Sequence, residues 1–260
     1  MILVALRRLL SAIPVLFIVS LISFGLMRLI PGDPAAAIAG TSATPAQIEQ
    51  LRRDLGLDEP LVLQLLHYYQ GLLQGDFGKS LLLGKGVLAA TMERLPVTIG
   101  LSLYALVLTL LIGVLSGIIA ALRQNTWIDQ FAMMIAMLGI SIPNFFLGLL
   151  MIVFFAVQLG WLPSGGYVPF AQDPIGWLRS TTMPAISLAL LQAGLLARIT
   201  RSGMLEVLRQ DYVRTARAKG VTEKTLILIH ALRPAVLPLV AYAGPLAASI
   251  LTGSLVIEEI

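Results

Sequence analysis

The segment Asp211–Pro234 lies between two long apolar runs, and its residue types favour contact with a protein partner over catalysis. From Asp211 to Lys219 the residues are mostly good helix formers, and Gly220 suits the left-handed conformation that ends a helix. Thr222 can begin a second helix, which we expect to run to about Leu232. The sequence therefore predicts a helix, a glycine turn and a second helix.

Basic and small side chains share the surface of the first predicted helix. Arg214, Arg217 and Ala218 lie on one face by their spacing, and Thr215, Ala216 and Lys219 lie on another. Small side chains beside bases allow a partner to approach closely. The second helix has little polar surface, so we expect it to lie against the rest of the protein while the first helix protrudes.

Two other interpretations of this segment remain open. A basic helix-turn-helix is compatible with DNA binding, but both of its ends join apolar runs and it has no dimerising scaffold of its own. The segment is also compatible with a solvated loop whose charges only fix the orientation of a membrane protein.

The chain has no complete catalytic motif. Gly78-Lys79-Ser80 matches the end of a phosphate-binding loop, but Leu73 stands where the first glycine is needed. Asp76-Phe77-Gly78 lacks the companion motifs of a kinase. His67 and His230 are expected on opposite sides of a membrane, and the chain has no cysteine. We therefore expect a protein that is not an enzyme, binds no metal or cofactor and takes energy from a partner.

Composition places these residues in a membrane protein. The 260-residue chain is 57% hydrophobic and 12% charged, with a mean hydropathy of +0.88. A soluble core cannot bury that much apolar surface. Five uncharged runs are long enough for helices that cross a bilayer. They lie between Arg8 and Arg28, Arg94 and Arg123, Gln130 and Trp161, Arg179 and Arg198, and Arg233 and Glu258.

The distribution of bases predicts the orientation. The loop 198–233 carries eight bases against three acids, which favours the cytoplasm. The N-terminus and the turn 123–130 are then also cytoplasmic, whereas residues 31–94 and the acids Glu258 and Glu259 lie outside. The first apolar run is longer than the core of a signal peptide, so we expect an uncleaved anchor. The net charge of +4 follows from this topology and requires no nucleic acid.

Polar groups inside the spans could line a path for a solute. Pro143 must kink or break the third span, and with Ser141 and Asn144 it is a candidate gate or pathway element. The spans hold almost no ionisable residue, which argues against a proton-driven carrier. Serine and threonine also bind transmembrane helices together, so each polar group has a structural alternative. The other candidates are Ser102, Tyr104, Thr109, Ser116, Gln158, Ser187, Gln192, Tyr242, Ser249 and Thr252.

Several motifs resemble one family of transport proteins. Thr215-Ala216-Arg217-Ala218-Lys219-Gly220, followed by Ala231-Leu232-Arg233-Pro234, is similar to the EAA loop of permease subunits in binding-protein-dependent ABC importers, in the dipeptide, oligopeptide and nickel branch. Two departures are Thr215-Ala216-Arg217 in place of Glu-Ala-Ala and His230 in place of isoleucine. Further motifs of that branch are Leu29–Pro34, Leu55–Pro60, Gly75–Ser80, Glu93–Pro96 and Ser141–Gly148, so the resemblance covers essentially the whole chain.

The resemblance implies an all-helical type I ABC importer permease in the plasma membrane, the inner membrane in a Gram-negative bacterium. Residues 1–93 would form an N-terminal span with an external segment, and 94–260 the ABC transmembrane domain. Its partners would be a second permease, two cytoplasmic ATPases that bind ATP and Mg²⁺, and an external solute-binding protein. The loop would be the coupling helix that contacts an ATPase, with the residues Asp211, Tyr212, Arg214, Thr215, Ala216, Arg217, Ala218, Lys219 and Gly220.

The implied substrates are dipeptides or oligopeptides, and nickel complexes and glutathione remain alternatives. An ATP-independent channel or secondary carrier is the alternative from another class. Members of the family continue with a sixth span after the sequence that matches Val256–Ile260, where the printed sequence ends. The external segment from Pro31 to Arg94 is expected to contain a helix over Leu61–Leu73 and to form a dock for the binding protein and a lid over the entrance.

Overall fold

The computed structural model describes residues 2–29, 32–40, 43–80 and 83–258. These residues form helices and connecting turns, and the only strand-like pairing among them is an isolated bridge between Lys79 and Gly86. The all-helical prediction is confirmed. The chain divides into two compact units, Met1–Glu93 and Arg94–Ile260. Pro31 and Glu259, which the sequence analysis places outside the membrane, are not among the described residues.

The described residues of the first unit form the helices α1 (Ile2–Leu29), α2 (Pro34–Ala39), α3 (Pro45–Asp54) and α4 (Leu61–Leu73). The predicted helix over Leu61–Leu73 is confirmed. Pro60, which occupies its N-cap position, has an extended backbone with φ −54° and ψ 142°. The helix ends before Gly75, whose φ of +80° favours a residue without a side chain.

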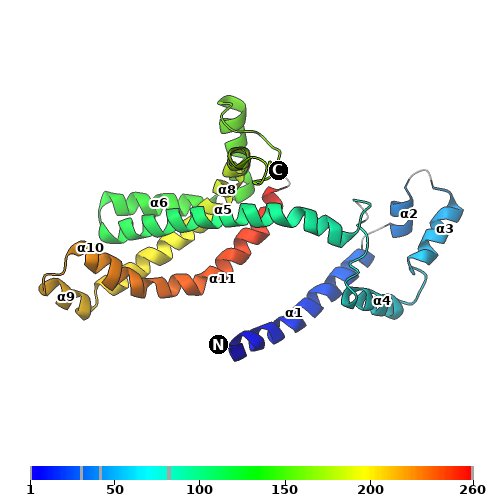
Figure 1. Cartoon of the computed structure of the whole chain (residues 1–260), viewed down its shortest axis with the longest axis horizontal. Coiled ribbons are helices and arrows are strands. Elements are labelled where there is room, and N and C mark those ends of the chain that lie inside the picture. The colour runs from blue at the N-terminus through cyan, green and yellow to red at the C-terminus, as the bar shows by residue number, and fades with distance from the viewer. Residues whose placement is uncertain (1, 30–31, 41–42, 81–82, 259–260) are drawn as a thin grey trace. The chain divides into compact units, whose positions relative to one another are not determined.

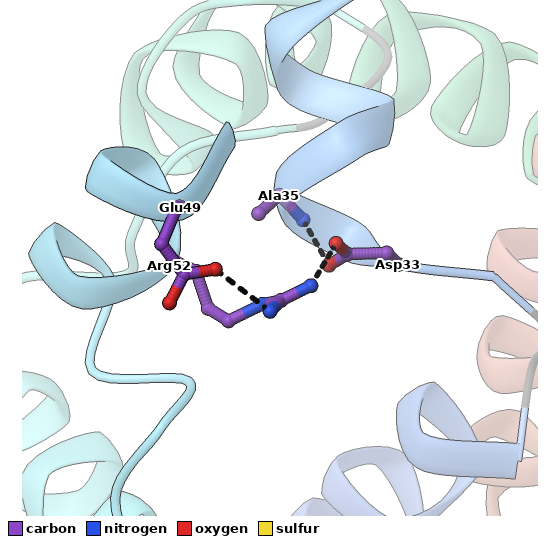
Figure 2. A network of polar contacts seen from close by, with 4 residues as sticks. All are labelled: Asp33, Ala35, Glu49 and Arg52. Carbon is purple, nitrogen blue, oxygen red and sulfur yellow. Dashed lines mark hydrogen bonds and ion pairs between the residues drawn. The ribbon is translucent and has the colours of Figure 1, made fainter. Parts of the chain in front are cut away.

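One carboxylate organises the start of α2, as Figure 2 shows. Asp33 accepts a hydrogen bond from the Ala35 N–H at 3.0 Å, which caps the helix, and Pro34 follows at the first helical position. Arg52 of α3 contacts Asp33 at 2.6 Å and Glu49 at 3.0 Å. The hydrogen bond from Arg52, together with those from backbone N–H groups, holds the pKa of Asp33 below its ordinary value.

The second unit is built on long helices. They are α5 (Val87–Leu122), which begins in the first unit, α6 (Trp127–Ser141), α7 (Asn144–Met151), the π-helical stretch η1 (Ile152–Gln158), α8 (Pro174–Leu208), α9 (Asp211–Ala218), α10 (Glu223–Thr225), the π-helical stretch η2 (Leu226–Ala231) and α11 (Leu232–Ile257). Within this unit, α9 and α10 lie at one end of the long helices, and the end of α11 lies at the other (Figure 1).

Four described helical segments are long and apolar enough to cross a bilayer, and a fifth span follows if α6 and the helix after it count as one; the four are Leu6–Leu26 within α1, then α5, α8 and Glu223–Ile257. That third span is broken, because the chain bends by 101° between Ser141 and Asn144. Pro143 lacks a backbone N–H and occupies the N-cap position of α7 with an extended backbone, φ −58° and ψ 137°. The predicted break at Pro143 is therefore confirmed.

The central helix of this unit is α8, which contributes the fully buried side chains of Leu196 and Met204. Two glycines allow its neighbours to approach. A Cβ added at Gly117 of α5 would lie 2.6 Å from the Ala197 oxygen, and one at Gly194 of α8 would lie 2.4 Å from the Ala136 oxygen of α6. Small residues at helix contacts are how apolar helices pack in lipid. The core of the unit thus lies along α8.

Candidate functional site

The predicted partner-binding helix forms as α9, with one side attached to the bundle. Its Val213 is fully buried, and so is Leu226 at the start of η2. The predicted partner residues lie on its other sides. The Asp211, Arg214, Thr215, Arg217, Ala218 and Lys219 side chains are exposed, Tyr212 is 46% exposed, and Ala216 is half-buried. The expectation that this helix protrudes is confirmed.

The glycine turn after α9 is closed by an ion pair. Gly220 has φ +79°, the left-handed conformation predicted for it. Across the turn, Arg217 donates from Nε to Glu223 Oε1 at 2.7 Å and from Nη2 to Glu223 Oε2 at 3.2 Å. The carboxylate of Glu223 raises the pKa of Arg217. Both side chains remain more than half exposed, so the pair fixes the turn and still faces outward.

Tyr212 supplies a hydrogen bond that the backbone cannot make. Its hydroxyl donates to the carbonyl of His230 at 3.3 Å. In an α-helix that carbonyl would accept from the residue four positions later, which is Pro234 and has no N–H. Tyr212 thus ties α9 to η2 at the point where the proline leaves an acceptor free.

The second predicted helix differs from the expectation at both ends. It does not end near Leu232, because η2 continues directly into α11, so one unbroken helical segment runs over 35 residues, Glu223–Ile257. The Leu232 N–H donates to the carbonyl of Ile227, five residues earlier. Such a wider turn keeps the helix continuous next to a proline. Thr222 occupies the N-cap position as predicted, but its hydroxyl bonds to Thr225 Oγ1 and caps no backbone N–H.

A buried ion pair lies at the same end of the bundle. Arg201 of α8 donates from Nε to Asp129 Oδ1 at 2.6 Å and from Nη2 to Asp129 Oδ2 at 2.7 Å. Asp129 also accepts from the Asn125 N–H at 3.0 Å, and only 3% of the residue is exposed. Asn125 has a positive φ of 64° in the turn before α6. The pair therefore joins α6, its preceding turn and α8.

The candidate gate residues stand at the bend of the third span. Ser141 donates its hydroxyl to the Met137 carbonyl at 2.9 Å in the last turn of α6. Asn144 begins α7, and its Oδ1 accepts from the Phe145 N–H at 2.9 Å. Ser141 thus bonds within its own helix, whereas Asn144 and Pro143 line a cavity against α8 and α11.

Three of the predicted polar groups form a network between α8 and α11. The Tyr242 hydroxyl donates to Gln192 Oε1 at 3.2 Å. The Gln192 Nε2 donates to Ser249 Oγ. Gln192 is only 4% exposed, so this hydrogen bonding satisfies an otherwise costly buried amide. The network is the largest polar cluster that the structure makes from the predicted pathway residues.

Most of the other predicted pathway residues form hydrogen bonds within a helix or between helices. Thr109, Ser116 and Ser187 donate to carbonyls four residues earlier in their own helices, and so does Thr252. The Tyr104 hydroxyl bonds to Thr182 at 3.3 Å. Ser102 is buried, and Gln158 lies exposed at the end of η1. The bonds that join neighbouring helices are those of Tyr104 to Thr182, of Thr109 to the Ala189 carbonyl and of Ser187 to Met151, whereas the buried Ser102 hydroxyl has no hydrogen-bond partner among the described residues.

The sequence analysis missed the Asp129–Arg201 and Arg217–Glu223 ion pairs. Asp129 is the single acid of a short turn and Arg201 one of many bases, so nothing in their sequence separation of 72 residues indicates contact. The Arg217–Glu223 pair had a usable signal, since opposite charges stand six residues apart across a glycine turn.

Comparisons with known proteins find two matching family models and several similar chains. Residues 113–260 match a family described as binding-protein-dependent transport system inner membrane component. Residues 1–102 match the N-terminal membrane component of such systems. The chain is 48% identical to a protein of Brucella suis biovar 1 that is provisionally named as a peptide transport system permease protein, over 98% of this chain and 81% of the relative. It is 42% identical to a glutathione transport system permease protein of Escherichia coli K12, over 98% and 80% of the two chains.

Proposed function

Because the chain belongs to the family of binding-protein-dependent transport system inner membrane components, we propose that it is the permease subunit of an ATP-driven importer of dipeptides or oligopeptides. It is a multi-pass membrane protein and, like its family, a transport component rather than an enzyme. The observation that carries the proposal is α9, an exposed basic helix that is anchored by one buried side chain, Val213, and closed by the Arg217–Glu223 pair.

In this proposal α9 binds a cytoplasmic ATPase. Its outward surface consists of Asp211, Arg214, Thr215, Arg217, Ala218 and Lys219, all exposed. Val213 and Tyr212 hold α9 against η2, and η2 continues into α11, so a displacement of α9 must also move α11. The Asp129–Arg201 pair supports transmission to α6, because it joins α6 to α8 near the point where α8 leads into α9.

The complete importer contains a second, similar permease, two ATPases and an external solute-binding protein. ATP and Mg²⁺ bind to the ATPases, and this chain holds no cofactor. The excess of bases in the loop 198–233 supports a cytoplasmic position for α9 and for the N-terminus. Residues 31–94 lie outside in this proposal, where the helix α4 docks the binding protein.

The bend at Ser141, Pro143 and Asn144 acts as a gate in the transport path. A break between two helices allows one half to move while the other stays packed. Asn144 faces the same cavity as Gln192 and Ser249, so opening of the bend would expose these uncharged polar groups to the solute. Uncharged walls suit a path that must release many different peptides.

Glutathione is the second candidate substrate, supported by the relative in Escherichia coli that is named as a glutathione permease. Glutathione contains peptide units, so the same path would serve it. A nickel complex is the remaining candidate within this class of importer, and an ATP-independent channel or carrier is the candidate outside it.

The test is purification of the protein from membranes in mild detergent, followed by mass spectrometry of the proteins that co-elute. We expect two ATPases and a sister permease with the wild type. Arg217→Glu should lose the ATPases, because it places a negative charge on the contact surface and beside Glu223. Glu223→Gln is the matched control, since it breaks the same internal pair but keeps the positive charge of Arg217.

If both variants lost the ATPases equally, the Arg217–Glu223 pair would act only by fixing the turn. If Arg217→Glu kept them, α9 would not be the ATPase contact. A wild-type protein that elutes alone would favour the carrier.

A further inference from the structure

A cavity of about 320 Å³ lies between the start of α7, the middle of α8 and the last turns of α11. This volume is at the lower end of the range for small-ligand pockets, about 300–1,000 Å³. No charged side chain lines it; the polar groups come from Asn144, Gln192, Ser249 and Thr252. Its size and lining suit a small neutral polar group.

Gly253 allows Asn144 to reach this cavity. A Cβ added at Gly253 would lie 3.0 Å from Asn144 Nδ2 and 2.9 Å from Leu188 Cδ2. The Asn144 Oδ1 accepts from the Phe145 N–H, which fixes the carboxamide. Its Nδ2 therefore lies beside α11 and carries two N–H groups, for which the described residues offer no acceptor.

The Gln192 network also orients the Ser249 hydroxyl, because Gln192 bonds to its oxygen. Gln192 is 4% exposed and uses its oxygen to accept from Tyr242 and its nitrogen to donate to Ser249 Oγ. Ser249 thus accepts from a buried group, and its own O–H finds no acceptor among the described residues. Thr252 donates its hydroxyl to the Ala248 carbonyl at 2.9 Å, which leaves its oxygen able to accept.

We propose that this cavity binds one backbone amide unit of the peptide in transit, with Asn144 and Ser249 donating to the peptide carbonyl and Thr252 Oγ1 accepting from the peptide N–H. The proposal rests on the proposed function and adds the part of the substrate that the permease itself contacts. A peptide unit has one donor and one acceptor whatever its side chain. The site therefore recognises peptides as a class.

The absence of charge from the lining selects the neutral backbone over the ends of the peptide. A terminal ammonium or carboxylate in a membrane cavity needs an opposite charge, and this cavity supplies none. A few neutral hydrogen bonds also give weak binding, which permits release to the cytoplasm.

The chain has no cysteine, so single introduced cysteines report on the cavity. Val256 lines it, whereas the neighbouring Leu255 does not, and their exposures are similar at 51% and 61%. We would reconstitute the full importer carrying Val256→Cys or Leu255→Cys and measure labelling by a membrane-permeant maleimide during ATP hydrolysis. The probe is a tripeptide, and peptide uptake is measured in the same vesicles.

The tripeptide should slow labelling of Val256→Cys by about twofold or more, as expected if the site is occupied for at least half of the cycle, and should leave Leu255→Cys unchanged. An analogue of the tripeptide in which esters replace both backbone amides should protect at concentrations about 2- to 10-fold higher, the effect of the one hydrogen bond that the site loses. Adding Ser249→Ala to the Val256→Cys protein should weaken protection by both compounds. Adding Ser254→Ala instead should leave protection unchanged, because Ser254 is fully buried and bonds to the Leu251 carbonyl outside the cavity.

Peptide uptake without protection of Val256→Cys would overturn this site and leave the proposed function intact. Equal protection by tripeptide and ester would also overturn it, because the backbone N–H would then make no contact. Vesicles that accumulate a nickel complex but no peptide would overturn the proposed function and the amide site together.

Discussion

Breaking the Asp129–Arg201 pair should destabilise the bundle strongly. The Asp129 side chain is 5% exposed and that of Arg201 26%, and two N–H groups bond both carboxylate oxygens at 2.6 and 2.7 Å. Asp129→Asn keeps the shape and an acceptor for the Asn125 N–H, but leaves the guanidinium without its counter-charge. Removal of one partner from a buried pair costs about 3–5 kcal/mol.

A double-mutant cycle separates the pair from its surroundings. Asp129→Asn and Arg201→Gln should each lower the free energy of unfolding, and the double variant should lose much less than their sum, because it leaves no unpaired charge. The assay is reversible unfolding of the purified protein in mixed micelles, followed by circular dichroism. Asp211→Asn is the control, since its contact with Arg214 is 3.7 Å long and almost fully exposed, and it should have no measurable effect.

Losses below about 1 kcal/mol for both single variants would refute the reasoning, because that is the size expected of an exposed pair. Strict additivity would also refute it. If the pair transmits motion from α9, a variant complex that still assembles should hydrolyse ATP with less peptide moved per ATP than the wild type.

Three further outcomes are expected. Gly220→Val should destabilise the turn by about 1–2 kcal/mol, since a β-branched residue is strained at φ +79°. ATPase binding in pull-downs should fall, whereas membrane insertion should stay normal. Gly220→Asn should reduce ATPase binding less than Gly220→Val. Tyr212→Phe should lower the free energy of unfolding by about 0.5–1.5 kcal/mol. It should also raise the hydrogen-exchange rate of the η2 amides, because the His230 carbonyl loses its donor. An unchanged exchange rate would show that this hydrogen bond does not hold η2. Asp33 has a lowered pKa in the folded protein. The stabilisation that ionised Asp33 gives to the fold is therefore complete above the ordinary pKa of about 3.9. It is lost as the pH falls through the lower pKa of the folded state. Hydrogen exchange of the α2 amides should therefore rise in acid, a pH effect that Asp33→Asn should abolish.

Elements with strong local signals were predictable. The uncharged runs predicted the spans, Pro143 predicted the break of the third span, and Gly220 predicted the turn after α9. Each prediction rests on a rule that acts within a few residues. The helix over Leu61–Leu73 was found in the same way.

Features that depend on distant residues were not predictable. Asp129 and Arg201 are 72 residues apart, and the Gln192 network joins residues 50 and 57 positions apart. The continuity of η2 with α11 was missed because proline usually marks a helix boundary; here a π-helical stretch precedes Pro234, and the Tyr212 hydroxyl serves the free carbonyl.

The most direct test of the central claim is uptake of a labelled peptide into vesicles that hold the reconstituted importer. We predict accumulation only with the binding protein, the ATPases, Mg²⁺ and hydrolysable ATP, and loss of accumulation with Arg217→Glu but not with Glu223→Gln. Peptide accumulation without the ATPases, or driven by a proton gradient alone, would contradict the account and identify a carrier.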